Sequence, residues 1–303
     1  MRFGIWPTPT QPWDDIYEIA THCERAGWDT VYVADHFMPN GPGPAPLDGD
    51  MLECWSVVAA LAASVPRVRL ASLVTSVTYR HPAVLANIAA AVDQISHGRL
   101  TLGIGAGWQL NEHAAYGIEL GTVRERMDRF EEAVQVVLGL LTQPRTSFGG
   151  KYFQLQDAPN QPAPVAGRLP LLIGGGGERR TLRTAARYAD EWNAWTTPGL
   201  LAHKLSVLHR HCEQVGRDPG EIHVSTQGLL FLSTDEQWLR DNVPAGRGLA
   251  VIAGTPAEVT EIIGRYQEAG ADEIIVPDTS LGPMARKKDT IDLFMTEVAA
   301  AFR

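Results

Sequence analysis

The sequence predicts an α/β fold in which eight parallel strands, each followed by a helix, close into a TIM-like barrel. Three observations support this. Short apolar and β-branched runs alternate with longer segments of helical period, as in repeated βα units. Most of these runs are apolar throughout, as expected of strands that are covered on both sides. The length of 303 residues suits a single barrel of this type, which takes about 250 residues.

The predicted elements follow one another in regular order. The strands are expected at 2–6, 30–34, 68–75, 100–104, 169–173, 191–195, 222–227 and 273–276. The helices are expected at 13–26, 52–63, 82–96, 124–141, 181–189, 200–215 and 256–269. Thr255 before Pro256 is typical of a capped helix start, and Gly27, Gly216 and Gly270 follow helix ends where a left-handed residue is favoured.

Two segments, 37–50 and 142–169, are rich in proline and glycine and interrupt this alternation. Connections in compact domains are usually only a few residues long, so we interpret both segments as insertions or lids within one domain that spans 1–303. Linkers between domains are the alternative interpretation.

The composition excludes several classes of function. With 26 Lys and Arg against 35 Asp and Glu, the net charge is −9, which disfavours binding to nucleic acid or to an anionic membrane. Three cysteines without CxxC spacing argue against a disulfide framework or a metal cluster, and no metal is expected. Since no signal peptide or membrane span is evident, we expect a cytoplasmic protein.

If the strands close into a barrel, the functional residues should follow the strands at their C-terminal ends. Asp35 and His36 follow the second predicted strand. Imidazole exchanges protons near neutral pH, and the neighbouring carboxylate could orient it or act beside it. A purely structural histidine is the alternative.

Two glycine-rich turns are further candidates. Four glycines, Gly174 to Gly177, link a predicted strand to a helix, an arrangement that favours phosphate binding, and a basic face follows at Arg179, Arg180, Arg183 and Arg187. A tight turn with solvated arginines is the alternative. The run Gly105-Ala106-Gly107 lacks the rest of a Rossmann fingerprint and suits a flat wall against a planar ring equally well.

Several segments of the sequence resemble the bacterial luciferase-like superfamily, in particular its branch of oxidoreductases that use the deazaflavin coenzyme F420. The resemblance rests on residues 27–37, 80–86, 98–108 and 173–177, the last leading into 189–193. It implies a barrel that binds its cofactor at the C-terminal face. It also implies a cis non-prolyl peptide at the end of the third strand, which by motif position falls at Ser72-Leu73.

The resemblance also assigns roles to residues. Asp35 and His36 match the catalytic pair beside the ring, and the residues that match cofactor-binding positions are Ser72, Leu73, Thr75, Gly105, Ala106, Gly107, Asn111, Gly174, Gly175, Gly176 and Gly177. Sugar-phosphate dehydrogenases of this branch have a glutamate at the position of Trp108 and a tryptophan at that of Asn40. Oxidation of a sugar phosphate is therefore not expected.

Trp6, Trp108 and Trp195 would instead line a pocket for a hydrophobic or aromatic substrate, with simple packing as the alternative. We expect hydride transfer with F420, in the direction that reduces a C=C, imine or carbonyl group, by a homodimer. One alternative is an FMN-dependent monooxygenase that uses oxygen and receives reduced flavin from a separate reductase. Another is a flavin-binding barrel without catalysis.

Overall fold

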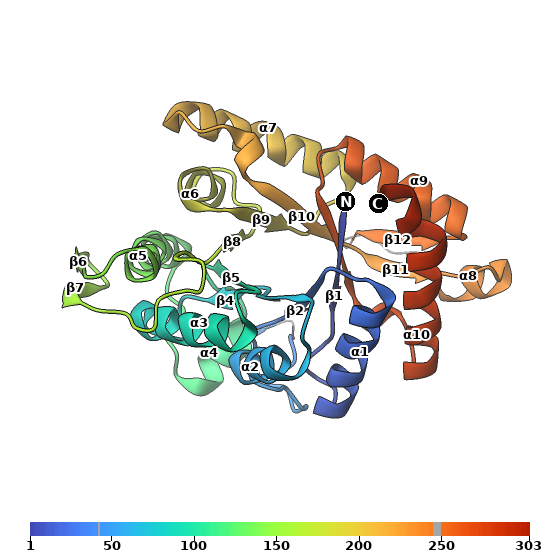
Figure 1. Ribbon diagram of the computed structural model, residues 1–303, viewed down its shortest axis with the longest axis horizontal. Coiled ribbons are helices and arrows are strands. Elements are labelled where there is room, and N and C mark those ends of the chain that lie inside the picture. Colours follow the sequence, from blue (N-terminus) through green and yellow to red (C-terminus); the bar gives the residue numbers. More distant parts are fainter. Residues whose placement is uncertain (42, 245–249) are drawn as a thin grey trace. The chain divides into compact units, whose positions relative to one another are not determined.

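The computed structural model describes residues 1–41, 43–244 and 250–303 (Figure 1). The strands of its main sheet pair in the order β3 (Arg69–Ser72), β2 (Thr30–Val33), β1 (Arg2–Trp6), β13 (Glu273–Pro277), β10 (His223–Gln227), β9 (Glu191–Ala194), β8 (Leu171–Gly174), β5 (Leu100–Gly105) and β4 (Thr75–Ser76). A further parallel pairing between β3 and β5 closes the sheet. The predicted (β/α)8 barrel class is thereby confirmed.

The chain forms two compact units. Unit 1 comprises Met1–Thr8, Asp14–Tyr32 and Gly175–Arg303, and unit 2 comprises Pro9–Trp13 and Val33–Gly174. No helix in the described ranges is long and apolar enough to cross a membrane.

Unit 1 contains the run of neighbouring parallel strands β2, β1, β13, β10 and β9. Its helices are α1 (Trp13–Ala26, whose first residue lies in unit 2), α6 (Thr181–Tyr188), α7 (Pro198–Val215), α8 (Glu236–Asn242), α9 (Pro256–Glu268) and α10 (Met284–Leu293). A separate parallel pair is formed by β11 (Leu229–Leu232) and β12 (Val251–Gly254). Three 3-10 turns are at Pro219–Glu221, Asp278–Ser280 and Ala299–Phe302, and a π turn is at Phe294–Val298.

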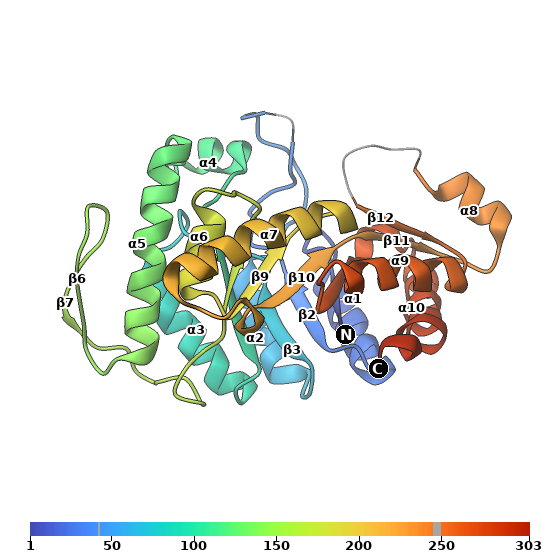
Figure 2. The same ribbon diagram turned by 90° about the horizontal axis from the view of Figure 1, so that it is seen from above.

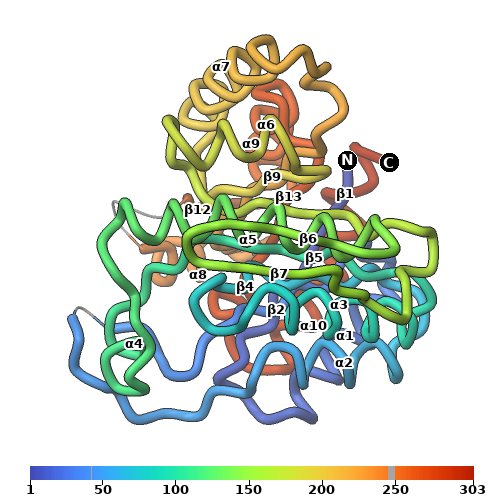
Figure 3. Tube along the Cα trace, turned by 90° about the vertical axis from the view of Figure 1, so that its left-hand side faces the viewer, coloured from blue at the N-terminus to red at the C-terminus, as the bar shows by residue number. Residues whose placement is uncertain are grey.

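Unit 2 contains β3, β4, β5 and β8, with β5 paired to each of the other three. Its helices are α2 (Cys54–Ser64), α3 (Pro82–Ser96), α4 (Leu110–Tyr116) and α5 (Val123–Thr142). An antiparallel hairpin of β6 (Thr146–Gly149) and β7 (Gln154–Ala158) runs along α5 (Figures 2 and 3). Glu132 of α5 accepts the backbone N–H groups of Lys151, Tyr152 and Phe153, so it ties the hairpin turn to the helix.

Most predicted boundaries agree with the structure to within two residues. Thr255 caps α9 through a reciprocal bond with Glu258, and Gly27, Gly216 and Gly270 have φ values of +93°, +68° and +100° at the predicted helix ends. The third predicted strand, 68–75, is divided into β3 and β4.

The cis non-prolyl bond joins Leu73 to Val74, so its expected position at Ser72-Leu73 is wrong by one residue. The elements α4, β11, β12, α8 and α10 and the hairpin within 142–169 were not predicted. The described part of 37–50 contains no helix or strand, and a lid role for either segment stays a prediction.

The N-terminal ends of the strands in unit 1 hold a buried charged layer. Glu273, which has no solvent exposure, forms an ion pair with Arg2 at 3.3 Å and lies 3.1 Å from Nε2 of His223, which in turn accepts from Nε of Arg2. Arg2 also lies 3.9 Å from Glu191. Because these charges are paired with one another, this end of the strands is a structural layer.

Candidate active site

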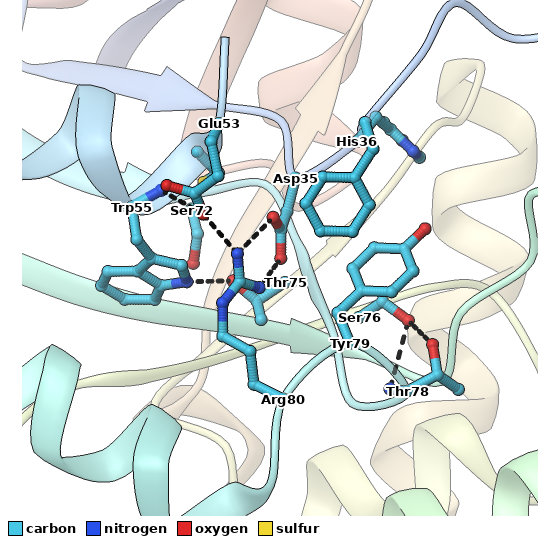
Figure 4. A network of polar contacts seen from close by, with 12 residues as sticks. Asp35, His36, Glu53, Trp55, Ser72, Thr75, Ser76, Thr78, Tyr79 and Arg80 are labelled. Carbon is cyan, nitrogen blue, oxygen red and sulfur yellow. Dashed lines mark hydrogen bonds and ion pairs between the residues drawn. The ribbon is translucent and has the colours of Figure 1, made fainter. Parts of the chain in front are cut away.

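Asp35 follows β2 and forms a buried ion pair in unit 2. Arg80 donates to both of its oxygens, at 2.6 and 3.1 Å, and also contacts Glu53, the N-cap of α2 (Figure 4). Burial raises the pKa of Asp35, while its ion pair with Arg80 opposes that rise. The two hydrogen bonds from Arg80 therefore hold the Asp35 carboxylate, and with it the backbone after β2, in one orientation.

His36, the next residue, is bonded to Glu112 of α4. Its Nδ1 lies 2.8 Å from Oε1 of Glu112, and the second carboxylate oxygen accepts the N–H of Phe37 at 2.7 Å. Tyr79 donates its hydroxyl to Oε1 as well. No hydrogen bond joins His36 to Asp35 within the described ranges. The expected acid–histidine pair is adjacent in sequence, but the carboxylate that contacts the imidazole is Glu112.

The state of Glu112 fixes the tautomer of His36. Burial favours the neutral acid, but hydrogen bonds from His36, Tyr79 and Phe37 outweigh it and lower the pKa of Glu112. A carboxylate only accepts hydrogen bonds, so Nδ1 of His36 carries the proton. Nε2 then has a lone pair in the neutral ring, and no described residue hydrogen-bonds to it.

Trp108 borders the same imidazole. The two rings meet edge to face, with centroids 5.7 Å apart at 80°, and 57% of Trp108 is exposed. A large exposed indole beside a histidine with a free nitrogen is typical of a ligand-facing surface.

Val74 lies above three glycines. A Cβ on Gly105 would come within 2.8 Å of Cγ2 of Val74, and one on Gly174 within 2.8 Å of both of its methyl groups. A Cβ on Gly103 would come within 1.9 Å of the carbonyl oxygen of Ser72. The expected cofactor contacts Gly105 and Gly174 thus make room for Val74, which is itself half-buried.

Several other predicted cofactor residues have buried side chains with protein partners. Ser72 bonds to the backbone of Gly103, Thr75 accepts from the indole of Trp55 at 3.1 Å, and Asn111 donates to the carbonyl of Pro39 at 2.9 Å. Leu73 is also buried, while Ala106 and Gly107 are half-buried. A ligand that bonds to Ser72, Thr75 or Asn111 would therefore add to these protein hydrogen bonds or replace them.

The glycine turn after β8 leads into unit 1. Gly175 has a φ of +121° and donates to the carbonyl of Asn193, whereas the N–H groups of Gly176 and Gly177 donate to no described residue. A Cβ on Gly176 would meet Cε of Lys204 at 3.6 Å, and Lys204 is bound by Glu178 at 2.7 Å. Two free amides beside a lysine suit a phosphate.

In unit 1, Trp6 and Trp195 meet edge to face at the ends of β1 and β9, with centroids 6.2 Å apart. Both are half-buried. Trp108 lies in unit 2. The sequence analysis missed Glu112, Tyr79, Arg80 and Lys204. In the sequence Glu112 stands beside His113, and nothing local relates it to His36.

Fold and site together define an α/β-barrel protein with a carboxylate-held histidine at a strand end. A family model described as luciferase-like monooxygenase matches residues 1–248. The chain therefore belongs to this family, and the family expected from the sequence is confirmed.

Similar proteins are named for coenzyme F420. An F420-dependent glucose-6-phosphate dehydrogenase of Kineococcus radiotolerans is 30% identical over 94% of this chain and 82% of its own length. An F420-dependent hydroxymycolic acid dehydrogenase of Mycobacterium tuberculosis is 32% identical over 74% of this chain and 60% of its own length. A solved F420-dependent secondary alcohol dehydrogenase superposes with a TM-score of 0.85 at 22% identity, covering 100% of this chain and 99% of that one.

Proposed function

We propose that this protein is an F420-dependent oxidoreductase that transfers a hydride between the deazaflavin and a hydrophobic or aromatic small molecule, in the reducing direction. The observation that carries the proposal is His36, whose Nδ1 is held by Glu112 and whose Nε2 has no described partner. The names of the curated relatives agree with this cofactor.

Residues of unit 2 fit a flat ring such as that of F420, and residues of unit 1, taken by themselves, fit a phosphate group. In unit 2, Val74 packs against Gly103, Gly105 and Gly174 and presents a rigid apolar surface suited to the back of a flat ring. In unit 1, the free N–H groups of Gly176 and Gly177, with Lys204 beside them, suit the phosphate of the cofactor tail. When bound, the deazaflavin supplies or accepts the hydride.

The proton is handled by His36. In the reducing direction the protonated imidazole donates from Nε2, and the Glu112 carboxylate stabilises the cation before the transfer. Asp35 has a positioning role in this proposal because Arg80 occupies both of its oxygens. It fixes the backbone from which His36 projects.

The substrate class follows from Trp108 and Asn40. These residues replace the glutamate and the tryptophan of the sugar-phosphate dehydrogenases, and Trp108 presents an exposed aromatic surface beside His36. An apolar or aromatic substrate suits that surface better than a sugar phosphate does.

Cofactor binding provides the first test. The purified protein is titrated with F420 and with FMN, and the dissociation constants are compared. Micromolar binding of F420 supports the proposal, whereas micromolar binding of FMN with none of F420 would establish the monooxygenase alternative. Tight binding of F420 without turnover on any reducible compound would favour a non-catalytic barrel.

Lys204→Met tests the phosphate contact. We expect this variant to bind F420 about tenfold more weakly, because a charge-assisted hydrogen bond is lost. The deazaflavin chromophore without its phosphate tail is the matched control, and its affinity should not change. Equal losses for both ligands would contradict the assignment.

A further inference from the structure

The side chains that face the same side of the sheet in unit 1 can be assigned from strand register. Asn193 of β9 donates to Ser225 of β10 at 3.0 Å, so these two point to the same face. Thr226 pairs with Ala194, which puts Trp195 opposite Gln227 one step further on. Side chains alternate along strands, so Trp195 and Gln227 lie on the face of Asn193 and Ser225, two residues nearer the C-terminal ends.

Trp6 faces the same side of the sheet but lies two residues further along by register, since it pairs with Pro277 whereas Gln227 pairs with Ile275. A Cβ on Gly4 would lie 3.0 Å from Oε1 of Glu273, so Gly4 faces the side on which Glu273 lies, and Trp6 two residues later faces it too. Glu273 is in register with Ser225. The ring contact between Trp6 and Trp195, with centroids 6.2 Å apart, agrees with this placement.

Three side chains on this face have a polar atom without a partner. Nε1 of Trp6, Nε1 of Trp195 and Oε1 of Gln227 are shielded from solvent and form no hydrogen bond with any described residue. Gln227 as a whole is only 8% exposed. Buried polar groups are nearly always paired, so each of these atoms requires an explanation.

Trp28, also in unit 1, shows that a single unpaired indole N–H does not by itself indicate a ligand site. Nε1 of Trp28 is also unpaired, but this indole packs against Phe294, with ring centroids 5.2 Å apart, and no second orphaned atom is described beside it in that contact. Single unpaired indoles therefore occur in this fold. By contrast, Trp6, Trp195 and Gln227 offer two donors and one acceptor on one face of the sheet. They lie at the strand ends where barrels bind their ligands, so together they can hydrogen-bond a ligand that has both an acceptor and a donor.

We propose that Trp6, Trp195 and Gln227 form a subsite for the carbonyl group of an uncharged, apolar or aromatic substrate. The two indole N–H groups donate to the carbonyl oxygen, and the indole rings pack against the apolar body of the ligand. Gln227 accepts from an N–H or O–H group where the ligand has one. This inference rests on the proposed function insofar as it takes the ligand to be the substrate.

Two cations of unit 1, Lys287 and Arg286, follow β13. The ion pair that follows β13 joins Asp278 to Lys287 at 2.6 Å and is neutral as a whole. Arg286 stacks on the ring of Trp238, with Cζ 3.4 Å from the centroid. Lys287 is therefore already paired, and a neutral carbonyl on the ligand needs no charged partner.

The test uses the whole protein without cofactor, labelled with ¹⁵N in its tryptophan indoles. Acetophenone and ethylbenzene, which differ in the carbonyl oxygen, are each titrated to about their aqueous solubility. We expect the indole N–H resonances of Trp6 and Trp195 to move with acetophenone and far less with ethylbenzene, while that of Trp28 stays in place. Equal shifts with both probes, or none with acetophenone, would overturn the proposal.

Two variants sharpen the comparison. Trp195→Phe should weaken acetophenone binding about fivefold and leave ethylbenzene within about twofold, since one hydrogen bond is removed and most of the ring remains. Gln227→Leu should weaken benzamide more than acetophenone, because only benzamide offers an N–H group. Equal losses for the two ligands would remove Gln227 from the subsite.

This experiment is independent of F420. If the indole resonances respond but F420 does not bind, the subsite stands and the proposed function fails. If F420 binds but the resonances do not respond, the proposed function stands and the subsite fails.

Discussion

Replacing Glu112 with glutamine tests the central interaction of the site with a change of one group. The carboxylate accepts from Nδ1 of His36 at 2.8 Å, from the N–H of Phe37 at 2.7 Å and from the hydroxyl of Tyr79. In Glu112→Gln the amide oxygen can keep the bond from Phe37. Its NH₂ group then faces His36 and donates to Nδ1, which reverses the tautomer and removes the stabilisation of the imidazolium.

The size of the effect follows from the lost bond. A hydrogen bond to a charged group contributes about 1.5 to 3 kcal/mol, which corresponds to a rate about 10- to 100-fold lower. The assay is single-turnover transfer from reduced F420 to an apolar acceptor, followed by the absorbance of the oxidised cofactor. Glu119→Gln is the matched control in unit 2, because the side chain of that glutamate is 79% exposed and its ion pair with Arg129 is 3.6 Å long.

A double-variant cycle separates positioning from general damage. In a His36→Ala background, Glu112→Gln should cause little further loss of rate, because the group that it orients is already absent. An unchanged rate for Glu112→Gln in the wild-type background, or a full additional loss in the His36→Ala background, would refute the reasoning.

The same substitution has a signature in stability against pH. Hydrogen bonds hold the pKa of Glu112 below its ordinary value of 4.5 despite the opposing effect of burial. Because the pKa of Glu112 is lower in the folded than in the unfolded protein, its ionised form stabilises the fold at a pH above the unfolded-state pKa. This stabilisation is lost as the pH falls through the folded-state pKa. Urea unfolding at pH 7 and at pH 4 should therefore show a smaller loss on acidification for Glu112→Gln than for the wild type. Equal losses would show that the carboxylate gains nothing from these bonds.

Two further predictions concern stability. Gly105→Ala places a Cβ 2.8 Å from Val74, and we expect overpacking to cost about 1 to 3 kcal/mol in urea unfolding, whereas Gly149→Ala, with nothing within 4 Å, should cost far less. Arg80→Met leaves the carboxylate of Asp35 buried and unpaired, which should cost about 3 to 5 kcal/mol. Adding Asp35→Asn should recover part of that loss; no recovery would show that Arg80 acts mainly through packing.

The fold was predictable because its signals are local. Several strands of the main sheet, such as β1, β5 and β8, contain short apolar runs, and helix ends such as Thr255 and Gly270 carry their own capping chemistry within a few residues. The strands β11 and β12 were missed because they pair with each other outside the main sheet and so fall outside the repeated βα pattern from which the other strands were predicted. The division of the third strand was missed because Leu73 and Val74, which separate β3 from β4, are apolar residues that favour a continuous strand.

The site was predictable only as far as the residues that follow a strand. His36 could be found because its place at the end of β2 is a property of the adjacent sequence. Glu112 lies 76 residues further along the chain and reaches His36 only when α4 folds over the end of β2. Asp35 was the nearer acid in sequence, but Arg80, 45 residues away, takes up its charge.

The glycines show why residue type alone was insufficient. A missing Cβ can admit a ligand or a neighbouring side chain, and the sequence is the same in both cases. At Gly105 and Gly174 the space is filled by the methyl groups of Val74, whereas at Gly176 the nearest atom belongs to the flexible end of Lys204. Substitution at the first two should therefore lower stability before it affects binding, while at Gly176 binding should respond first. The relative order of these two losses, measured on Gly174→Ala and Gly176→Ala by urea unfolding and F420 titration, distinguishes packing glycines from ligand-facing ones.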